Sequence, residues 1–543
     1  MAKRYENYTK EQLLEKIKQL EKHRYGLVWE DKLEDVAEQC EQFLPVLNED
    51  ISKEIFSDQN LPNNILIEGD NYHALYTLNF THKRKIDLVY IDPPYNTGNK
   101  DFKYNDYFVD REDSFRHSKW LSFMNKRLKL AKNLLKDTGV IFISIDDNEV
   151  SQLRMICDKI FNEMNFIATI IWEKKFSPQN DAKWFSDNHD FILLYAKNKN
   201  KWKPNLVGRN EKQLLRYKNP DNDPRGVWAS SGLDVKTYSA EYDYEITTPS
   251  GRKVNPPAST CWRFSKAKLK ELISDNRISF GKNGNNVPRL KRFLNEVKEG
   301  ITPLTIWKHE EVGHTQEATQ ELKKFGIGDF TSPKPVRLIS KILKIATNEN
   351  SIVLDFFAGS GTTGQAVIEL NQQDEGNRQF ILCTNNENNI CEEVTYPRIK
   401  NVIKGYNGNK GISANLKYFK TDFVPQVITD NDKRVLVNHS TELLCLAENT
   451  FDLVKQSKRK SDFVIYKSSN QFTAIIYDED SIEKCKTELE ALKPKTKTII
   501  YVFSYDHEYN TEDFLDLTIL FEVKPIPEAI LNVYRKNAKL RKK

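Results

Sequence analysis

The sequence predicts an α/β protein built around a parallel β-sheet. Short apolar runs typical of strands alternate with patterns of helical periodicity over residues 61–200 and again over residues 331–410. Several of these runs end in an acidic residue, and one leads straight into a turn of small residues, Ala358 to Gly361. Because parallel sheets bind their ligands at the carboxyl ends of their strands, these polar ends predict a single functional edge.

Residues 1–60 are expected to form a helical arm. Thr9 and Gln12 have the spacing of a capping box, and leucine and isoleucine residues follow at helical intervals up to Leu20. The first half of the sheet is expected to contain the strands NNILIEGD (63–70), KIDLVYIDPPY (85–95), VIFISIDD (140–147), FIATIIWEK (166–174) and DFILLYAKN (190–198). Helices are expected over 120–139, where Gly139 ends the pattern, and over 149–164.

The regular alternation stops after about residue 200. Residues 201–330 are rich in Asn, Pro, Gly and aromatic residues, which is typical of an inserted domain of irregular structure. They contain 23 Lys and Arg against 16 Asp and Glu. A local basic excess is typical of a phosphate-binding face, although an ordinary solvated surface explains it equally well.

The α/β pattern returns in the last part of the chain. A helix is expected over PVRLISKILKIAT (335–347), and strands over SIVLDFF (351–357) and QFILCT (379–384), within a second half-sheet of residues 331–410. A further α/β region is expected over 411–543, with strands DFVIYK (462–467), FTAIIYD (472–478) and TIIYVFS (498–504).

The composition predicts a soluble cytoplasmic protein without contact to membranes. The 543 residues carry a net charge of +5, and no apolar run approaches the roughly 18 residues that a membrane-spanning helix needs. The N-terminus has no apolar leader. The seven cysteines include no C-x-x-C pair, so neither a metal site nor a disulfide framework is expected.

Two strand ends carry unusual residues. Asp92, Pro93, Pro94 and Tyr95 follow one apolar strand, and prolines direct their carbonyl groups while supplying no N–H donor. An acid and a carbonyl beside an aromatic ring suit an exocyclic amino group on a flat ring, such as N6 of adenine. The second strand ends at Asp355 before the glycines of AGSG, which permit a close approach of the backbone to a ligand. A purely structural turn would contain the same glycines.

Together, DPPY and FAGSG resemble the motifs of the amino-methyltransferases of DNA, which use S-adenosylmethionine. The order of the motifs, with DPPY first, the irregular domain second and FAGSG last, resembles the β class of adenine-N6 methyltransferases. The segments YGLVWE (25–30), ISIDDNE (143–149), NHDFILLYAKN (188–198) and PIPEAILNVYRK (525–536) resemble the modification (Mod) subunits of type III restriction-modification systems. The resemblance implies a circularly permuted, doubly wound methyltransferase sheet, interrupted by a target-recognition domain over 201–330.

The resemblance also implies the roles of single residues. It implies that Asp92, Pro93, Pro94 and Tyr95 hold the target amino group. The residues that it places beside S-adenosylmethionine are Asp70, Asp92, Lys334, Asp355, Phe357, Gly359, Gly361 and Thr362. One departure is that the acid expected to bind the cofactor ribose comes late, as Glu387 after Asn385 and Asn386.

The expected partners are double-stranded DNA, a second copy of the chain and an ATP-dependent restriction (Res) subunit. The inserted domain would read the DNA through cations interleaved with aromatic residues: Arg216, Lys218, Arg225, Arg252, Lys253, Arg263, Trp228, Tyr238, Tyr242, Tyr244 and Trp262. Residues 411–543 would carry the dimer and partner contacts, because Ile530, Val533 and Tyr534 form an apolar helical face. Packing of this face against its own domain is the alternative.

Four other functions fit parts of the pattern. An orphan adenine methyltransferase without a nuclease partner would have the same catalytic residues. A non-catalytic DNA-binding subunit would not need the intact motifs. Cytosine-N4 methyltransferases usually have Ser in place of Asp92, and protein-glutamine methyltransferases usually have Asn there.

Overall fold

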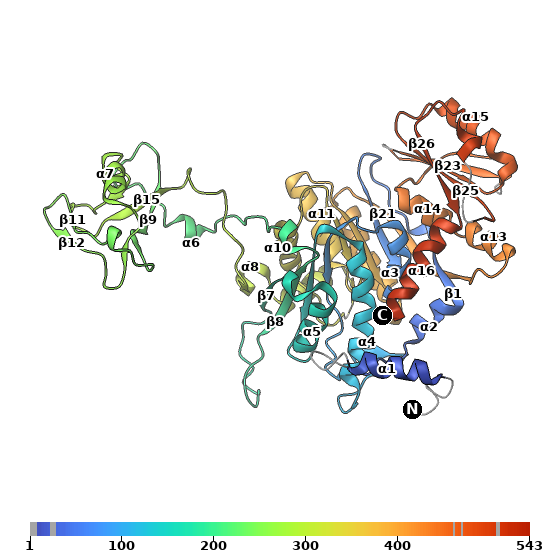
Figure 1. Cartoon of the computed structure of the whole chain (residues 1–543), viewed down its shortest axis with the longest axis horizontal. Helices are drawn as coiled ribbons and strands as arrows, with labels where there is room; N and C mark the ends of the chain where they lie inside the picture. Colours follow the sequence, from blue (N-terminus) through green and yellow to red (C-terminus); the bar gives the residue numbers. More distant parts are fainter. Residues whose placement is uncertain are drawn as a thin grey trace. The chain divides into compact units, whose positions relative to one another are not determined.

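The computed structural model describes residues 8–21, 29–328, 330–459, 462–468, 471–506 and 511–542. The chain divides into two compact units (Figure 1). The first unit consists of Met1–Lys203 and Leu304–Lys543, and the second of Pro204–Pro303. Residues 25–28 of the segment YGLVWE lie outside the described ranges.

A ten-stranded sheet forms the centre of the first unit. Its strands are, in spatial order, β1 (Phe43–Glu49), β21 (Asn415–Pro425), β2 (Asn63–Glu68), β18 (Gln379–Thr384), β17 (Ile352–Asp355), β3 (Ile86–Ile91), β6 (Leu135–Ile145), β8 (His189–Ala196), β7 (Phe166–Glu173) and β16 (Ile306–Trp307). The six strands from β21 to β6 are parallel. They confirm the predicted α/β sheet.

The sheet is mixed at both sides, where antiparallel pairs interrupt the expected parallel order. β1 pairs antiparallel with β21, and β8 pairs antiparallel with both β6 and β7. The physical reason is connectivity. No helix crosses over between β7 and β8, and two successive strands without a crossover can pair only in antiparallel fashion.

Helices pack against the sheet and connect its parallel strands. The main ones are α3 (Asn71–Thr81), α4 (Arg116–Leu134), α5 (Val150–Phe161), α10 (Val336–Ala346), α11 (Thr362–Asp374) and α12 (Tyr396–Lys404). α4 ends at Leu134 rather than at Gly139, because Leu135 already pairs with Ile86 at the start of β6. None of the helices in the described ranges is long and apolar enough to cross a membrane.

The central strands are buried on both faces. Val353 and Leu354 of β17 pair with Leu88 and Val89 of β3, and all four side chains are inaccessible to solvent. Parallel strands covered by helices on both faces are expected to be continuously apolar. This explains why their polar residues, Asp92 among them, lie at the ends of the strands.

The N-terminal segment is only partly helical. It contains α1 (Lys10–Glu21), α2 (Asp35–Gln42) and the edge strand β1. The pairing of β1 with β21 joins the start of the chain to a strand some 370 residues later. The expected helical arm of residues 1–60 therefore differs from the structure, in which Phe43–Glu49 is a strand of the central sheet.

The expected start of a separate C-terminal region at residue 411 was wrong, because β21 is a strand of the central sheet. The helices α13 (Asp430–Asn438) and α14 (Thr441–Glu448) follow. A separate five-stranded sheet contains β22 (Asp452–Gln456), β23 (Phe463–Lys467), β24 (Phe472–Ile476), β25 (Thr498–Phe503) and β26 (Phe521–Ile526), with the helices α15 (Ile482–Leu492) and α16 (Glu528–Lys542). The three strands expected in this region are thus present.

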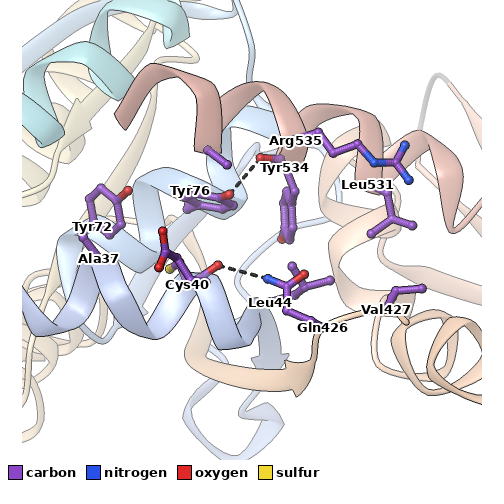
Figure 2. A pocket seen from close by; sticks show the side chains of 12 residues that line it. Ala37, Cys40, Leu44, Tyr72, Tyr76, Gln426, Val427, Leu531, Tyr534 and Arg535 are labelled. Atoms are coloured by element: carbon purple, nitrogen blue, oxygen red, sulfur yellow. Dashed lines mark hydrogen bonds between the residues drawn. The ribbon is translucent and has the colours of Figure 1, made fainter. Parts of the chain in front are cut away.

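Helix α16 packs against its own unit. The Tyr534 hydroxyl donates a hydrogen bond to the Pro45 carbonyl (2.6 Å), and the Tyr76 hydroxyl of α3 donates to the Tyr534 carbonyl (2.8 Å). Ile530 and Tyr534 are buried. A cavity of about 380 Å³ beside them is lined by α2, α3 and α16, and contains none of the predicted site residues (Figure 2). The apolar face that suggested a partner interface is therefore used within the chain.

The second unit has its own small core. Its elements include α6 (Glu211–Leu214), β9 (Trp228–Gly232), β10 (Asp234–Val235), β11 (Ile246–Thr247), β12 (Lys253–Val254), β13 (Cys261–Trp262), α7 (Lys266–Ser274), β14 (Ile278–Ser279) and β15 (Arg289–Phe293). Leu233, Ile246, Trp262, Leu269 and Phe280 fill its interior. The basic excess lies here, with 18 Lys and Arg against 11 Asp and Glu over 204–303.

The boundary of this unit differs from the expected range of 201–330. Residues 304–328 belong to the first unit, because β16 pairs with β7 and because α8 (His309–Val312) and α9 (Thr315–Lys324) pack beside α10. Arg337 of α10 forms an ion pair with Glu317 of α9 (2.6 Å). These contacts are distant in sequence, so the local composition of the segment did not reveal them.

Candidate active site

The two motifs meet at the carboxyl edge of the central sheet. Asp92 follows β3, and the glycine turn follows the neighbouring strand β17. Lys334, which is buried, joins them: its ammonium group donates to Asp92 Oδ2 (2.7 Å), and its carbonyl accepts a hydrogen bond from the Thr362 hydroxyl (3.1 Å). The predicted catalytic and cofactor-side residues are thus brought together at one edge.

Tyr95 lies directly against the carboxylate of Asp92. Its hydroxyl donates to Asp92 Oδ1 (3.0 Å) and lies 3.3 Å from Asp190 Oδ2. Burial and the charge of Asp92 raise the pKa of the Tyr95 phenol well above its usual value. The phenol therefore stays protonated and holds one oxygen of Asp92.

The indole of Trp120 holds the Pro93-Pro94 step in place. Trp120 of α4, which is inaccessible to solvent, donates a hydrogen bond from Nε1 to the Pro94 carbonyl (2.7 Å). Pro93 is buried and Pro94 is half-buried. The direction of the loop after Asp92 is thereby fixed by a core side chain that the sequence motif does not include.

A buried acid that sequence reasoning missed holds the residue after Tyr95. Asn96 donates from Nδ2 to Glu149 Oε1 (2.6 Å), and His117 Nδ1 lies 2.7 Å from the same oxygen. The Glu149 side chain has no exposed surface, and burial raises its pKa to about 8. Glu149 ends the segment ISIDDNE, so its place near a strand end was the available signal.

The glycine turn has the conformation that its sequence predicts. Gly359 has φ +46° and Gly361 has φ +77°, in the left-handed region that favours glycine. Asp355 braces the turn from inside by accepting hydrogen bonds from the Phe357 N–H (3.0 Å) and the Thr363 hydroxyl (2.6 Å). Burial raises the pKa of Asp355 to about 7. Asp355 therefore contacts the turn itself rather than an open surface.

Arg398 of α12 supports the same turn and was also missed. This side chain is fully buried, and it donates to the Thr362 hydroxyl (2.8 Å), Ser360 Oγ (3.1 Å) and Gln365 Oε1 (2.7 Å). Burial lowers its pKa to about 10. A buried guanidinium group thus fixes the first turn of α11, and no local sequence pattern indicated it.

The third part of the edge is formed by the end of β2. Asp70 caps α3 by accepting a hydrogen bond from the Tyr72 N–H (2.7 Å), and Arg127 Nη2 lies 3.4 Å from the same oxygen. Arg127 stacks on Phe123 at 3.6 Å, and Phe123 contacts Phe357 with ring centroids 5.8 Å apart. Asp70, Phe357 and Gly359 keep partly exposed surface. They offer an acceptor, an apolar face and backbone.

The segment expected near a ribose has internal partners. Glu387 forms an ion pair with Lys103, and the Asn386 amide donates to Glu392 (3.2 Å). In the described ranges no group of three or more His, Cys, Asp and Glu residues could hold a metal ion, and all seven cysteines are buried. The identity of the ribose-binding residue stays an open prediction.

The chain is similar to known DNA-modifying proteins. A family model described as DNA methylase matches residues 86–396. The Mod subunit of the type III restriction-modification enzyme StyLTI of Salmonella typhimurium strain LT2 is 36% identical over 392 residues, which are 67% of this chain and 59% of that protein. The Mod subunits of EcoPI of Escherichia phage P1 and EcoP15I of Escherichia coli are 33% and 31% identical over 443 residues.

The residues matched by the family model, 86–396, contain both motifs and the whole second unit. For the EcoPI and EcoP15I subunits the alignment covers 70% and 69% of this chain and 67% of each relative. For the StyLTI subunit the chain spans about three fifths of the relative's length. On the family match over residues 86–396 and on these identities, the chain belongs to the DNA methylase family.

Proposed function

We propose that this chain transfers a methyl group from S-adenosylmethionine to N6 of an adenine in double-stranded DNA, as the modification and recognition subunit of a type III restriction-modification system. The observation that carries the proposal is the position of Lys334, which contacts both Asp92 and Thr362. The acid of DPPY and the helix that follows the glycine turn are therefore linked by a single residue, Lys334. The named relatives, which are Mod subunits of type III enzymes, support the same conclusion.

The adenine has to leave the duplex stack, because its N6 cannot otherwise reach a buried methyl donor. The flipped base would stack on Tyr95, and its amino group would donate to Asp92 and to the Pro93 carbonyl. Since the protonated Tyr95 phenol already occupies Oδ1, the amino group would take the place of Lys334 at Oδ2. These contacts orient the nitrogen lone pair, so the protein acts by positioning and electrostatics.

S-adenosylmethionine, when bound, supplies the electrophilic methyl group. The residues around the glycine turn fit such a cofactor, because Asp70 offers an acceptor for an adenine amino group and Phe357 offers a ring. Lys334 would balance the charge near Asp92. Asp355, Gly361 and Thr362 are buried, and their proposed role is to hold the glycine turn in shape.

The second unit would read the DNA sequence. Arg216, Lys218, Arg252 and Arg263 are exposed on it and suit phosphates or guanine edges. Trp228 and Trp262 are buried, and Arg225 is paired with Asp223 (2.9 Å), so these three residues stabilise the unit. Its basic excess supports contact with a nucleic acid.

The proposed partners are a second copy of the chain and an ATP-dependent restriction subunit. Light scattering of the full chain would show a dimer, and a native pull-down would recover a helicase-like subunit. A monomeric chain that recovers no such subunit would favour the orphan methyltransferase instead.

The proposal is tested by sequencing genomic DNA for modified bases, with and without the gene. N6-methyladenine at one short motif is expected only when the gene is present. The purified chain should then transfer label from S-adenosylmethionine to that motif, and the variant Asp92→Asn should not. Modified cytosine, or equal labelling by the variant, would refute the proposal.

A further inference from the structure

The connection between β7 and β8, residues 174–188, starts from the edge of the sheet that carries Asp92. Phe191 at the start of β8 pairs with Ile145 at the carboxyl end of β6, and Ile143 pairs with Ile91 at the end of β3. The connection therefore leaves the sheet beside the candidate active site. Figure 1 shows it as a long loop that projects beyond the strands.

The base of this loop is tied to the catalytic tyrosine. Lys174 forms an ion pair with Asp190 Oδ1 (2.6 Å), and the other oxygen of Asp190 lies 3.3 Å from the Tyr95 hydroxyl. Phe176 stacks on His309 with ring centroids 5.0 Å apart. The position of the loop is thereby coupled to that of Tyr95.

Above this base, hydrogen bonds close the two sides of the loop. The Lys175 N–H donates to the Asn188 carbonyl (3.2 Å), and the Gln179 N–H donates to Ser186 Oγ (3.0 Å). The tip that remains contains two neighbouring aromatic residues, Trp184 and Phe185. Their side chains are 82% and 95% exposed.

Two adjacent aromatic rings exposed at the tip of a closed loop are unusual for a protein surface, and such groups mark contact sites. The loop contains three lysines against two aspartates, and Lys183 Nζ lies 5.1 Å from the centre of the Trp184 ring. Flat rings beside a cation suit stacked bases and their phosphates. The tip thus has the chemistry of a nucleic-acid contact and lies on a loop anchored at the active site.

We propose that Trp184 and Phe185 form an aromatic wedge that enters the DNA duplex at the target site. The wedge stacks in the space that the flipped adenine leaves and holds the base pair open. This proposal rests on the proposed function, because it requires a flipped base in a duplex. Aromatic and apolar side chains that enter between bases compensate for lost base stacking.

The test uses the methylation motif found by genomic sequencing and two duplexes that contain it. The first duplex is fully paired, and in the second an abasic site replaces the thymine opposite the target adenine. The double variant W184A/F185A is compared with the wild-type chain and with M164A. Met164 is 78% exposed and lies before β7, at the opposite edge of the sheet, so it is a control for loss of exposed apolar surface.

On the paired duplex the double variant is expected to lose roughly 5- to 150-fold in kcat/KM, the range expected for one lost stacking contact. On the abasic duplex its rate should lie within about threefold of the wild-type rate, because an unpaired adenine no longer needs to be held out of the stack. The variant M164A should match the wild-type chain on both duplexes. The single variants W184A and F185A show which ring enters the stack.

Equal loss on both duplexes would overturn the wedge and make the loop a general binding element. No loss on the paired duplex would overturn it as well. If the wild-type chain methylates neither duplex, the proposed function fails, and the wedge fails with it. Loss confined to the paired duplex supports both.

Discussion

The first prediction concerns stability and Glu149, the buried acid that holds Asn96, the residue after Tyr95. Burial raises its pKa to about 8, from 4.5. Between these two values the folded chain keeps a proton on Glu149 that the unfolded chain has lost. The free energy of unfolding therefore falls as the pH rises through this window, by about 1.4 kcal/mol per pH unit from this one group.

The full window of about 3.5 pH units corresponds to about 5 kcal/mol, an order-of-magnitude figure. The variant Glu149→Gln keeps the size of the side chain and an acceptor oxygen for Asn96, but it cannot ionise. Relative to the wild-type chain, it should become steadily more stable from pH 5 to pH 8. Urea unfolding, followed by fluorescence at closely spaced pH values, measures this difference.

His117 provides the control, because its imidazole contacts the same oxygen. Burial lowers the pKa of His117 below its usual 6.5. The unfolded chain therefore binds a proton on His117 that the folded chain has lost, and the free energy of unfolding from this group rises as the pH rises towards 6.5, opposite to the effect of Glu149. The variant His117→Gln should therefore keep the downward slope above pH 6.5. Parallel stability curves for Glu149→Gln and the wild-type chain would refute the assignment of a buried, protonated acid.

Three further predictions concern the candidate site. Asp92→Asn should abolish methyl transfer in single-turnover assays with labelled cofactor. Asp92→Ala should in addition lower the free energy of unfolding by about 3 kcal/mol, because it leaves the buried Lys334 ammonium without the acceptor oxygen that an asparagine side chain would still offer. Unchanged transfer in both variants would exclude Asp92 from the reaction. Gly359→Val and Gly361→Val should weaken S-adenosylmethionine binding about tenfold or more in calorimetry. Each variant forces a branched residue into a left-handed backbone conformation, at a cost of about 1–3 kcal/mol. The control is Gly208→Val, where the added side chain meets open space. Arg398→Lys should raise the KM for the cofactor several-fold, because one ammonium cannot replace the three side-chain hydrogen bonds, and an unchanged KM would make Arg398 a support of the fold alone.

Local patterns predicted the parts of the fold that depend on neighbouring residues. The strands that contain Leu88 and Leu354 were correct, because fully buried parallel strands are continuous apolar runs. The turn at Gly359 was correct, because few other residues adopt its backbone conformation. The strand ends at Asp70 and Asp92 followed from the same reasoning, and they gave the position of the candidate site.

Pairing between distant segments was not predictable in this way. β1 was assigned to a helical arm, yet its backbone forms hydrogen bonds with β21, a strand some 370 residues later in the sequence. β16 was assigned to the inserted domain, although it pairs with β7. Only two residues form β16, which is too short for any periodicity to be visible.

The two buried ionisable residues that the sequence reasoning missed explain how the motifs keep their shape. Glu149 and Arg398 have fully buried side chains. Glu149 accepts a hydrogen bond from Asn96, the residue after DPPY, and Arg398 donates one to Thr362, the first residue of the helix after FAGSG. Buried charges are costly unless they are protonated, paired or fully hydrogen-bonded, so their presence beside Asn96 and Thr362 requires a compensating role. The shape of both motifs therefore depends on buried hydrogen-bonding side chains that lie outside them, Glu149 just before α5 and Arg398 in α12. A chain with both motifs intact but without the hydrogen bonds of these two side chains should fold and bind less well than its motifs predict.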